Sequence, residues 1–187
     1  PDVAAEEGKD ADNDGCTDPD TTESSNANDD FEGTGNLFWK PDGTTTYDEA
    51  FANPFKGTGN TSATVLKYND NGDQYSNINF NLSGDNSVKF DLTTKHVFTV
   101  KVYVPTPDVT VSEPKQLSLK LQDGSAGEPW NGQTEVIQPY VYDQWQTLTF
   151  DFSEVSDETK YSRIVVQFNG EDNYEVVEGY IDDVLLQ

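Results

Sequence analysis

Short runs in which apolar and polar side chains alternate dominate this sequence from about residue 30 to its end. The clearest run spans residues 97–104. It places Phe98, Val100, Val102 and Val104 on one face of a strand, and Thr99, Lys101 and Tyr103 on the other. Successive side chains of a strand point to opposite faces, so a run of this kind predicts a strand with one buried face. Apart from a short turn at 153–160, no stretch has the apolar spacing of a helix.

Clusters of Gly, Asn, Asp and Pro separate these runs, and these residue types favour turns. We expect strands at 30–33, 46–51, 62–68, 77–83, 88–91, 97–105, 115–122, 134–142, 145–152, 163–169 and 177–186. Many short antiparallel strands predict an all-β fold, a β-sandwich of the jelly-roll type. This domain is expected to span residues 30–187.

Residues 1–29 form a separate segment with almost no large apolar side chain. Eleven of the 35 acidic residues lie at positions 1–30, against Lys9 alone. A DxDxDG motif and a further acid lie within it, at Asp10, Asp12, Asp14, Gly15 and Asp18. Carboxylates at this spacing before a glycine can wrap a calcium ion, and the motif resembles a thrombospondin type 3 repeat. Thr21 stands where an EF-hand needs Glu. Two interpretations stay open, a single calcium-binding repeat or an acidic linker.

The acidic charge of the chain argues against partners that are themselves strongly anionic. It has 35 Asp and Glu against 11 Lys and Arg, a formal net charge of −24. Such a surface repels phosphate backbones and anionic lipids, which argues against nucleic-acid binding and membrane insertion. Many aromatic residues among many Asn, Asp, Thr and Gly are typical of extracellular β-rich binding domains. We therefore expect a secreted or cell-surface monomer, tethered to other domains because the sequence starts like the inside of a longer protein.

Catalytic chemistry finds little support in the sequence. His96 is the only histidine, and we expect it on the surface or at a strand edge. Cys16 lies in the acidic segment, so a Cys–His pair is not expected, and a Ser-His-Asp site could use only His96. Carboxylates for glycoside hydrolysis are plentiful, but the sequence patterns of jelly-roll β-glucanases and alginate lyases are missing. We therefore expect no enzymatic activity.

Residues suited to sugar binding are present. Sugar sites stack aromatic rings on pyranose faces and place polar side chains against the hydroxyls. Trp39 and Trp130 lie in stretches with the Gly and Pro of loops, where little local core could bury them, so we expect both to be exposed for binding. Trp145 begins a strand and is expected to be a structural cap. Further candidates on the polar faces of the middle strands are Lys101, Tyr103, Lys120, Gln122, Tyr140 and Tyr142, although an ordinary solvated face would contain the same residue types.

The last expected strand carries two adjacent carboxylates, Asp182 and Asp183, in its middle. They cannot share one side of the sheet unless the strand bulges. A half-buried carboxylate needs a hydrogen-bonding partner or a cation. We expect one of the two to hold a structural calcium ion and the other to face solvent or a ligand groove. Which of them faces the ion stays open.

A family resemblance adds to this interpretation. The motifs that carry it are DFEG at 30–33, WQTLTFDFS at 145–153 and YIDDV at 180–184. In this order they resemble carbohydrate-binding modules of the family 4/9/16/22 type, galactose-binding-like jelly rolls often attached to secreted polysaccharidases of marine Bacteroidetes. The resemblance covers residues 30–187 and implies noncatalytic polysaccharide binding, with a structural Ca²⁺ that ties the first strand to the last. The ligands it implies are Asp30, Glu32, one of Asp182 and Asp183, and carbonyls of the 56–61 loop, with Gly57 and Asn60.

The function expected from all of this is noncatalytic binding of a polysaccharide, stacked on Trp130 and Trp39. A neutral β-glucan such as laminarin is the first choice, because the charge of the protein disfavours sulfated or uronic polymers. Lys101 and Lys120 could still meet an acidic sugar. Two alternatives stay open: a calcium-rigidified structural or adhesion module of a surface protein, and a small polysaccharide lyase or hydrolase.

Overall fold

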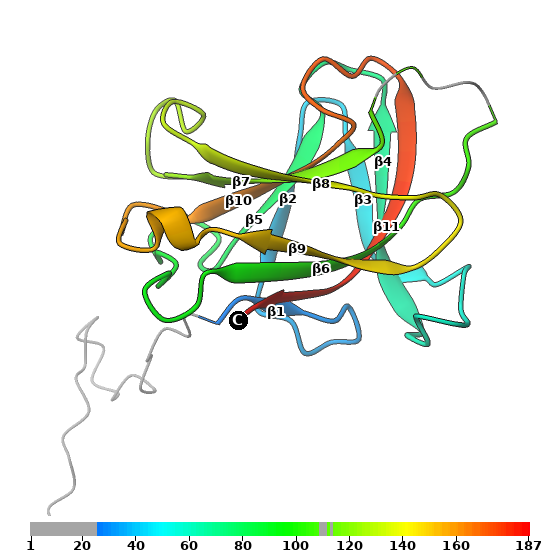
Figure 1. Cartoon of the computed structure of the whole chain (residues 1–187), viewed down its shortest axis with the longest axis horizontal. Helices are drawn as coiled ribbons and strands as arrows, with labels where there is room; N and C mark the ends of the chain where they lie inside the picture. Colours follow the sequence, from blue (N-terminus) through cyan, green and yellow to red (C-terminus); the bar gives the residue numbers. More distant parts are fainter. Residues whose placement is uncertain (1–25, 109–111, 113) are drawn as a thin grey trace, which may run out of the picture.

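Two antiparallel β-sheets pack face to face in the computed structural model, which describes residues 26–108, 112 and 114–187 (Figure 1). One sheet has the strand order β3-β4-β11-β6-β9, with β1 paired to β11, and the other has the order β2-β5-β10-β7-β8. The strands are β1 Asn28–Asp29, β2 Phe38–Asp42, β3 Thr46–Ala52, β4 Thr64–Asn71, β5 Asn77–Asn81, β6 Val97–Tyr103, β7 Gln116–Gln122, β8 Thr134–Pro139, β9 Gln146–Asp151, β10 Arg163–Phe168 and β11 Val176–Leu186. This arrangement confirms the predicted all-β sandwich.

The core lies between the sheets and is filled by alternate residues of their strands. Aromatic rings meet at its centre: the ring of Phe98 in β6 contacts Phe90 and Phe152 edge to face, with centroids 5.8 and 6.0 Å away. The remaining side chains of each strand point away from the core, because side chains alternate along a strand. No helix in the described part of the chain is long and apolar enough to cross a membrane.

The strands differ from the sequence prediction in three segments. Residues 38–42, taken as a loop, form strand β2, which pairs only with β5. Pro41 is tolerated there because an edge strand has a side that needs no backbone donor. Residues 30–33 and 88–91 were predicted as strands and are not. At the first of these segments the chain bends at Phe31, which has φ 53° and donates its N–H to Asp29 Oδ1.

The sandwich also includes residues before the predicted boundary at 30. Ala27 is buried in the core, and Asn28 and Asp29 pair with Leu185 and Val184 of β11. The predicted DxDxDG residues Asp10, Asp12, Asp14 and Asp18 lie outside the described residues.

Strand β11 bulges at its adjacent carboxylates. Its pairing with β6 shifts between Asp182 and Leu185, and Asp183 has φ 43°. Because Ile181 and Val184 both face the core, the bulge places both carboxylates on the outer face of the sheet. Asp182 is fully buried there and accepts a hydrogen bond from Asn60, whereas Asp183 is exposed.

Candidate functional site

The outer face of the sheet β2-β5-β10-β7-β8 carries polar side chains from neighbouring strands in register. They point away from the core because the residues that alternate with them, mostly apolar, fill it. The pairing of the strands aligns Gln122 with Arg163 and Asn81, Lys120 with Val165 and Asn79, and Ser118 with Gln167. The sheet therefore presents successive cross-strand rows of amide, hydroxyl and charged groups.

A cleft of about 620 Å³ lies over this face. Its volume falls in the range of roughly 300–1,000 Å³ that is typical of ligand sites. The strands contribute Asn77, Lys120, Gln122, Arg163, Val165 and Gln167, and the rest of the lining includes Tyr75, Trp130 and Glu171 from loops. The cleft thus combines a floor held by the sheet with walls from the loops that follow β4, β7 and β10.

Two exposed aromatic side chains line the cleft. Trp130 is 58% exposed and Tyr75 is 57% exposed. Trp130 lies in the loop between β7 and β8, where its carbonyl accepts the Gln133 N–H at 3.4 Å. Tyr75 lies just before β5, has φ 64° and donates its N–H to the Glu171 carbonyl at 3.1 Å. The turn therefore fixes the Tyr75 backbone while its ring stays accessible.

The aromatic residues stand at different ends of the cleft. Trp130 follows the end of β7, where Gln122 lies, whereas Tyr75 precedes β5 at the other end of the sheet (Figure 1). The strand span between them, from Gln122 to Ser118 in β7, is roughly 13 Å at about 3.3 Å per residue. The cleft is therefore long enough for more than one sugar ring.

The charged groups of the cleft are paired with one another. Lys120 is almost fully buried and lies between Glu171, 2.5 Å from its Nζ, and Glu135, at 3.6 Å. Arg163 donates from Nε to Gln122 Oε1 at 2.9 Å. Burial lowers the pKa of Arg163, and the carboxylate of Asp42 opposes this shift. The floor thus has hydrogen-bonding groups with little uncompensated charge.

Several polar atoms on this face of the sheet have no hydrogen-bond partner within the described part of the chain. They are Asn77 Oδ1, Asn81 Nδ2, Ser118 Oγ and Gln167 Oε1. Two of them, on Asn77 and Gln167, belong to residues that line the cleft. Buried polar groups in folded proteins are nearly always satisfied, by protein, water or a ligand. Their concentration on one sheet face indicates that this face is built to meet a polar ligand or its ordered water.

The structure brings together part of the predicted site. Trp130, Lys120 and Gln122 line the cleft as a group. Lys101 lies instead on the outer face of the other sheet, where it pairs with Asp183. Tyr103 also lies on that face, stacked on Phe55 with ring centroids 4.0 Å apart. These residues cannot contribute to the cleft.

The prediction for Trp39 is wrong. Its side chain is 6% exposed and packs between Phe31 and Phe80 in the core, because Trp39 belongs to strand β2 and not to a loop. His96 is half-buried just before β6 and does not line the cleft.

Sequence reasoning missed Tyr75, Arg163 and Glu171. Arg163 begins a run that alternates weakly, and only the strand pairing shows that it lies beside Gln122. Tyr75 stands in an Asn, Asp and Gly turn (69–77). This is the same kind of loop context that pointed to Trp130, so composition could have identified it.

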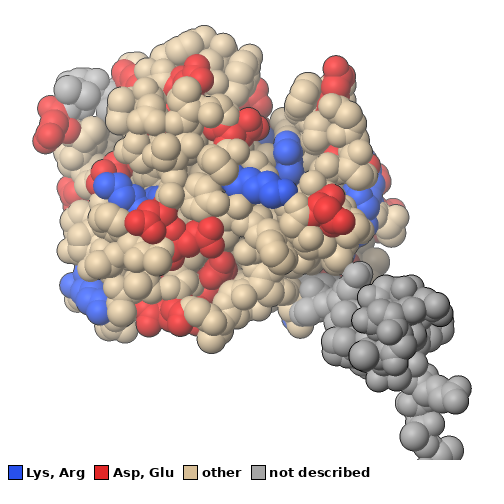
Figure 2. Space-filling model, turned by 180° about the vertical axis from the view of Figure 1, so that it is seen from behind, with Lys and Arg blue, Asp and Glu red and all other residues tan. Residues whose placement is uncertain are grey.

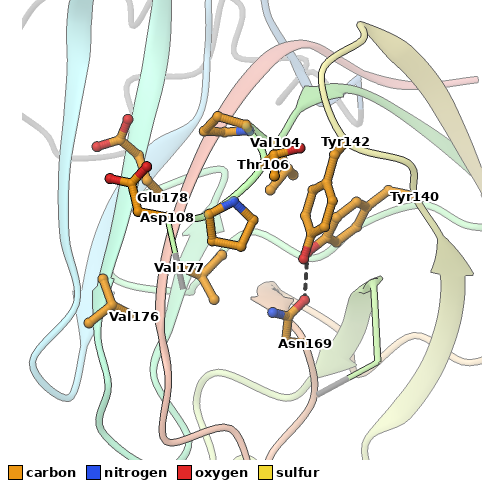
Figure 3. Close-up of a pocket in the computed structure, with 11 residues that line it drawn as sticks. Val104, Thr106, Asp108, Tyr140, Tyr142, Asn169, Val176, Val177 and Glu178 are labelled. Carbon is orange, nitrogen blue, oxygen red and sulfur yellow. Dashed lines mark hydrogen bonds between the residues drawn. The ribbon is translucent and has the colours of Figure 1, made fainter. Parts of the chain in front are cut away.

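Tyr140 and Tyr142 line a second cavity, of about 460 Å³ (Figure 3). It shares no lining residue with the cleft. Tyr140 is buried and donates its hydroxyl to Asn169 Oδ1 at 2.7 Å. These tyrosines, predicted to line the same face as Lys120, therefore belong to a separate place in the fold.

The predicted calcium ligands lie around the bulge of β11 and the segment that covers it. Asp182 Oδ2 accepts from Asn60 Nδ2 at 2.6 Å, and its Oδ1 accepts the Asp183 N–H at 2.9 Å. Burial raises the pKa of Asp182, against these hydrogen bonds. Glu32 accepts the Thr64 N–H at 2.8 Å, and Gly57 pairs with Asn60 through the backbone.

No group of three or more Asp, Glu, His or Cys side chains converges among the residues described. Asp30 accepts from the Glu32 N–H and the Thr34 hydroxyl and is half-buried. A calcium ion here would thus be held by Asp182 and Glu32 with amide and carbonyl oxygens, a donor set that suits a hard cation. The calcium site stays a prediction.

Comparisons with known proteins identify the fold. No family model matches the sequence, and no curated protein matches it. Solved structures do. The C-terminal family 22 carbohydrate-binding module of Clostridium thermocellum Xyn10B is 19% identical over 85% of this chain and 90% of that one, with a TM-score of 0.52. A family 22 xylan-binding domain also gives 19% identity and a TM-score of 0.52, over 85% of this chain and 91% of that one.

A structure of the N-terminal CBM22-1 and GH10 modules of C. thermocellum xylanase 10B, complexed with xylohexaose, is 14% identical with a TM-score of 0.51. It matches 80% of this chain, which covers 26% of that longer one. At these identities the likeness concerns the fold. The fold is the β-jelly roll of carbohydrate-binding modules.

Proposed function

We propose that this chain is a noncatalytic carbohydrate-binding module that binds a neutral polysaccharide in the cleft between Trp130 and Tyr75. The observation that carries the proposal is the combination of two exposed aromatic rings with a floor that contains buried side-chain amides, two of whose oxygens have no partner among the described residues. Aromatic rings would stack on the apolar faces of sugar rings, and the floor would bond their hydroxyls. The jelly-roll fold supports the same class of function.

The arrangement of charge supports binding without catalysis. Glu171 and Glu135 are engaged by Lys120, and Asp42 faces the charge of Arg163. Hydrolysis of a glycosidic bond by the usual route needs a carboxyl group free to give a proton and a second one to act as base or nucleophile. Carboxylates held by cations on the cleft floor are poorly suited to the first of these roles.

A neutral β-glucan of the laminarin type is the ligand we propose first. The chain has a net charge of −24, and acidic side chains are scattered over the face seen in Figure 2, with a few basic ones among them. This field repels uronic and sulfated polymers. The structural neighbours named for xylan or xylohexaose make xylan the next candidate. By analogy with the two-module neighbour, we propose that the chain works beside other domains of a secreted or cell-surface protein.

Isothermal titration calorimetry of the full chain with laminarihexaose, cellohexaose, xylohexaose and mannohexaose tests the proposal. Trp130→Ala and Tyr75→Ala should each weaken binding by about three- to tenfold, because each removes one stacking ring. Tyr174→Ala is the matched control, since Tyr174 is 62% exposed but does not line the cleft. It should bind as the wild type does.

Two results would contradict the proposal. If binding is unchanged by both aromatic substitutions, the cleft is not the binding site. If none of the oligosaccharides binds, the proposed function is wrong. Release of reducing ends or unsaturated products from the same glycans would show an enzyme instead. Failure of all sugars together with cation-dependent self-association would favour a structural or adhesion module.

A further inference from the structure

The second cavity lies where segments distant in the sequence meet at one edge of the sandwich. Its lining comes from residues 104–108 after β6, from Tyr140 and Tyr142 after β8, from Asn169 after β10, and from residues 176–178 at the start of β11. Figure 3 shows the tyrosine rings on one side of the cavity and Asp108, Val176 and Glu178 on the other. The cavity is therefore a pocket assembled by the fold and not by one flexible loop.

One buried polar group of the pocket, the Asn169 amide, has spare hydrogen-bonding capacity. Asn169 is almost fully buried, and its Oδ1 accepts the Tyr140 hydroxyl. Within the described residues, its Nδ2 donates to no other group. Asn169 also has φ 60°, in the left-handed region that asparagine adopts more readily than most other non-glycine residues. Burial raises the pKa of Tyr140, so its hydroxyl stays a neutral donor to Asn169.

The remaining walls combine apolar surface with oxygen acceptors. Pro105, Pro107, Val176 and Val177 supply apolar surface. Tyr142 adds an aromatic ring whose centroid lies 5.8 Å from that of Tyr140. Thr106, Asp108 and Glu178 supply hydroxyl and carboxylate oxygens. A ligand with an apolar ring face and a polar edge matches both kinds of wall.

Two of the charged groups at the pocket, Glu178 and Lys115, have partners, whereas the carboxylate of Asp108 is exposed to solvent. Glu178 pairs with Lys67 at 2.7 Å and accepts the Tyr180 hydroxyl at 2.5 Å. Lys115 Nζ lies 4.2 Å from the centre of the Tyr142 ring. Among the described lining residues no buried charge is unpaired, so the buried part of the pocket suits an uncharged ligand, for whose hydroxyl groups it has donors and acceptors.

We propose that this pocket is a second carbohydrate site, which binds one or two sugar units at an end or branch of a neutral glycan. Its volume, about 460 Å³, is smaller than that of the cleft, and it is lined by different residues. The ring of Tyr142 stacks on the sugar, Asn169 Nδ2 donates to a ring or hydroxyl oxygen, and Asp108 and Glu178 accept hydroxyl protons. The proposal does not depend on the cleft, and with both sites filled one molecule would hold a glycan at two places.

Titration by ¹⁵N–¹H correlation NMR tests the pocket in the full chain carrying Trp130→Ala, so that the cleft is weakened. The probes are laminaribiose, cellobiose, xylobiose and mannobiose. At least one should shift the Asn169 side-chain NH₂ signal saturably. Tyr142→Ala should weaken that binding by about three- to tenfold, the range for losing one aromatic contact. Tyr174→Ala is the matched control and should leave it unchanged.

A second variant tests the pocket in case Tyr142→Ala does not fold. Val176 is 60% exposed and lines the pocket, so Val176→Trp should fill the pocket, abolish the shift and leave the unfolding temperature unchanged. The proposal is overturned if none of the disaccharides shifts Asn169, or if the shift persists in both pocket variants. A shift with methylammonium alone would identify a cation site and also overturn it. Failure of the proposed cleft function would be seen in a separate measurement on the wild type. In that case the hexasaccharides would not shift the signals of Gln122 and Lys120.

Discussion

Trp39 and Asp29 form a buried polar contact that joins β2 to β1. The Trp39 Nε1–H donates to Asp29 Oδ2 at 2.9 Å, and the Phe31 N–H donates to Asp29 Oδ1 at 3.0 Å. Burial raises the pKa of Asp29, and these two hydrogen bonds oppose the shift. A carboxylate in this position depends on each donor, because water cannot replace a lost one.

Trp39→Phe is therefore expected to lower the free energy of unfolding by about 1–3 kcal/mol, the penalty for a buried acceptor that loses its donor. Urea denaturation measures it. Trp145→Phe is the matched control: Trp145 is half-buried and donates to the Phe55 carbonyl at 3.0 Å, so its loss should be smaller. Sugar binding should be equal in both variants and the wild type. If Trp39→Phe instead bound sugar more weakly at unchanged stability, Trp39 would have to be part of the sugar-binding site.

The residues of the cleft were predictable only where local sequence decides their exposure. Trp130 stands in a Gly-rich loop, so its exposure follows from the sequence. Lys120 and Gln122 alternate with core leucines, so the sequence predicts that they point away from the core, although both are buried in the cleft floor. Their meeting with Arg163 does not follow from the sequence, because it depends on the pairing of β7 with β10, 41 residues apart for the Arg163–Gln122 contact. The prediction that Trp39 is exposed was wrong because local sequence was misleading there. Pro41 indicated a loop, whereas the fold has an edge strand at this position.

At the scale of elements, β11 fastens the sandwich through the segment that covers its bulge. Asp182 on β11 and Asn60 are 122 positions apart and bond directly at 2.6 Å. Glu32, which follows β1, bonds the Thr64 N–H at the start of β4. These two contacts tie the segments around Asn60 and Glu32 to β11 and β4, and the calcium ion expected here stays a prediction.

Calcium is expected to raise the unfolding temperature of the chain, because an ion that binds only the folded state stabilises it by mass action, by about 2.7 kcal/mol at 100 times its Kd. Differential scanning calorimetry in CaCl₂ and in EDTA measures the difference. Asp182→Asn should lose it, while Asp183→Asn, whose side chain pairs with Lys101, should keep it. Equal unfolding temperatures in CaCl₂ and EDTA would reject the site, and MgCl₂ at the same ionic strength controls for screening by a divalent ion.

Strands with a strict alternation were the predictable part of the fold. β6, β7 and β9 match their expected ranges closely, because one apolar face per strand leaves a single way to bury it. Short strands and edge strands could not be predicted in this way, because they lack a clear apolar–polar alternation. β1 is Asn28–Asp29 and contains no apolar residue, so it exists only because β11 offers backbone partners and Ala27 enters the core.

For the whole molecule, the acidic composition makes stability depend on pH in a definite direction. Burial raises the pKa of Asp29, Asp70 and Asp182 above the ordinary value of 3.8. A folded state that holds protons more tightly than the unfolded chain gains stability as pH falls through the folded pKa. The net charge of −24 adds repulsion that acidification also relieves.

Other carboxylates act in the opposite sense at lower pH. Hydrogen bonds from Ser87 and Ser125 lower the pKa of Asp85 and Asp123 to about 2. Their contribution is present above 3.8 and is lost as pH falls toward 2. As the pH is lowered from 7, the unfolding temperature is therefore expected to rise to a maximum that lies above pH 3.8, and to fall at still lower pH. Many proteins, by contrast, are most stable at about pH 5–8.

Thermal unfolding at constant ionic strength in EDTA, in half-unit steps from pH 7 to pH 2.5, measures this profile. Asp70→Asn should flatten the acidic rise, because Asp70 is 1% exposed and its titration is removed. Asp85→Asn, at an exposed carboxylate, should leave the rise intact and soften the fall below 3.8. An unfolding temperature that only decreases from pH 7 downward would mean that paired surface carboxylates outweigh the buried ones, so that the burial of Asp29, Asp70 and Asp182 does not govern the acid response.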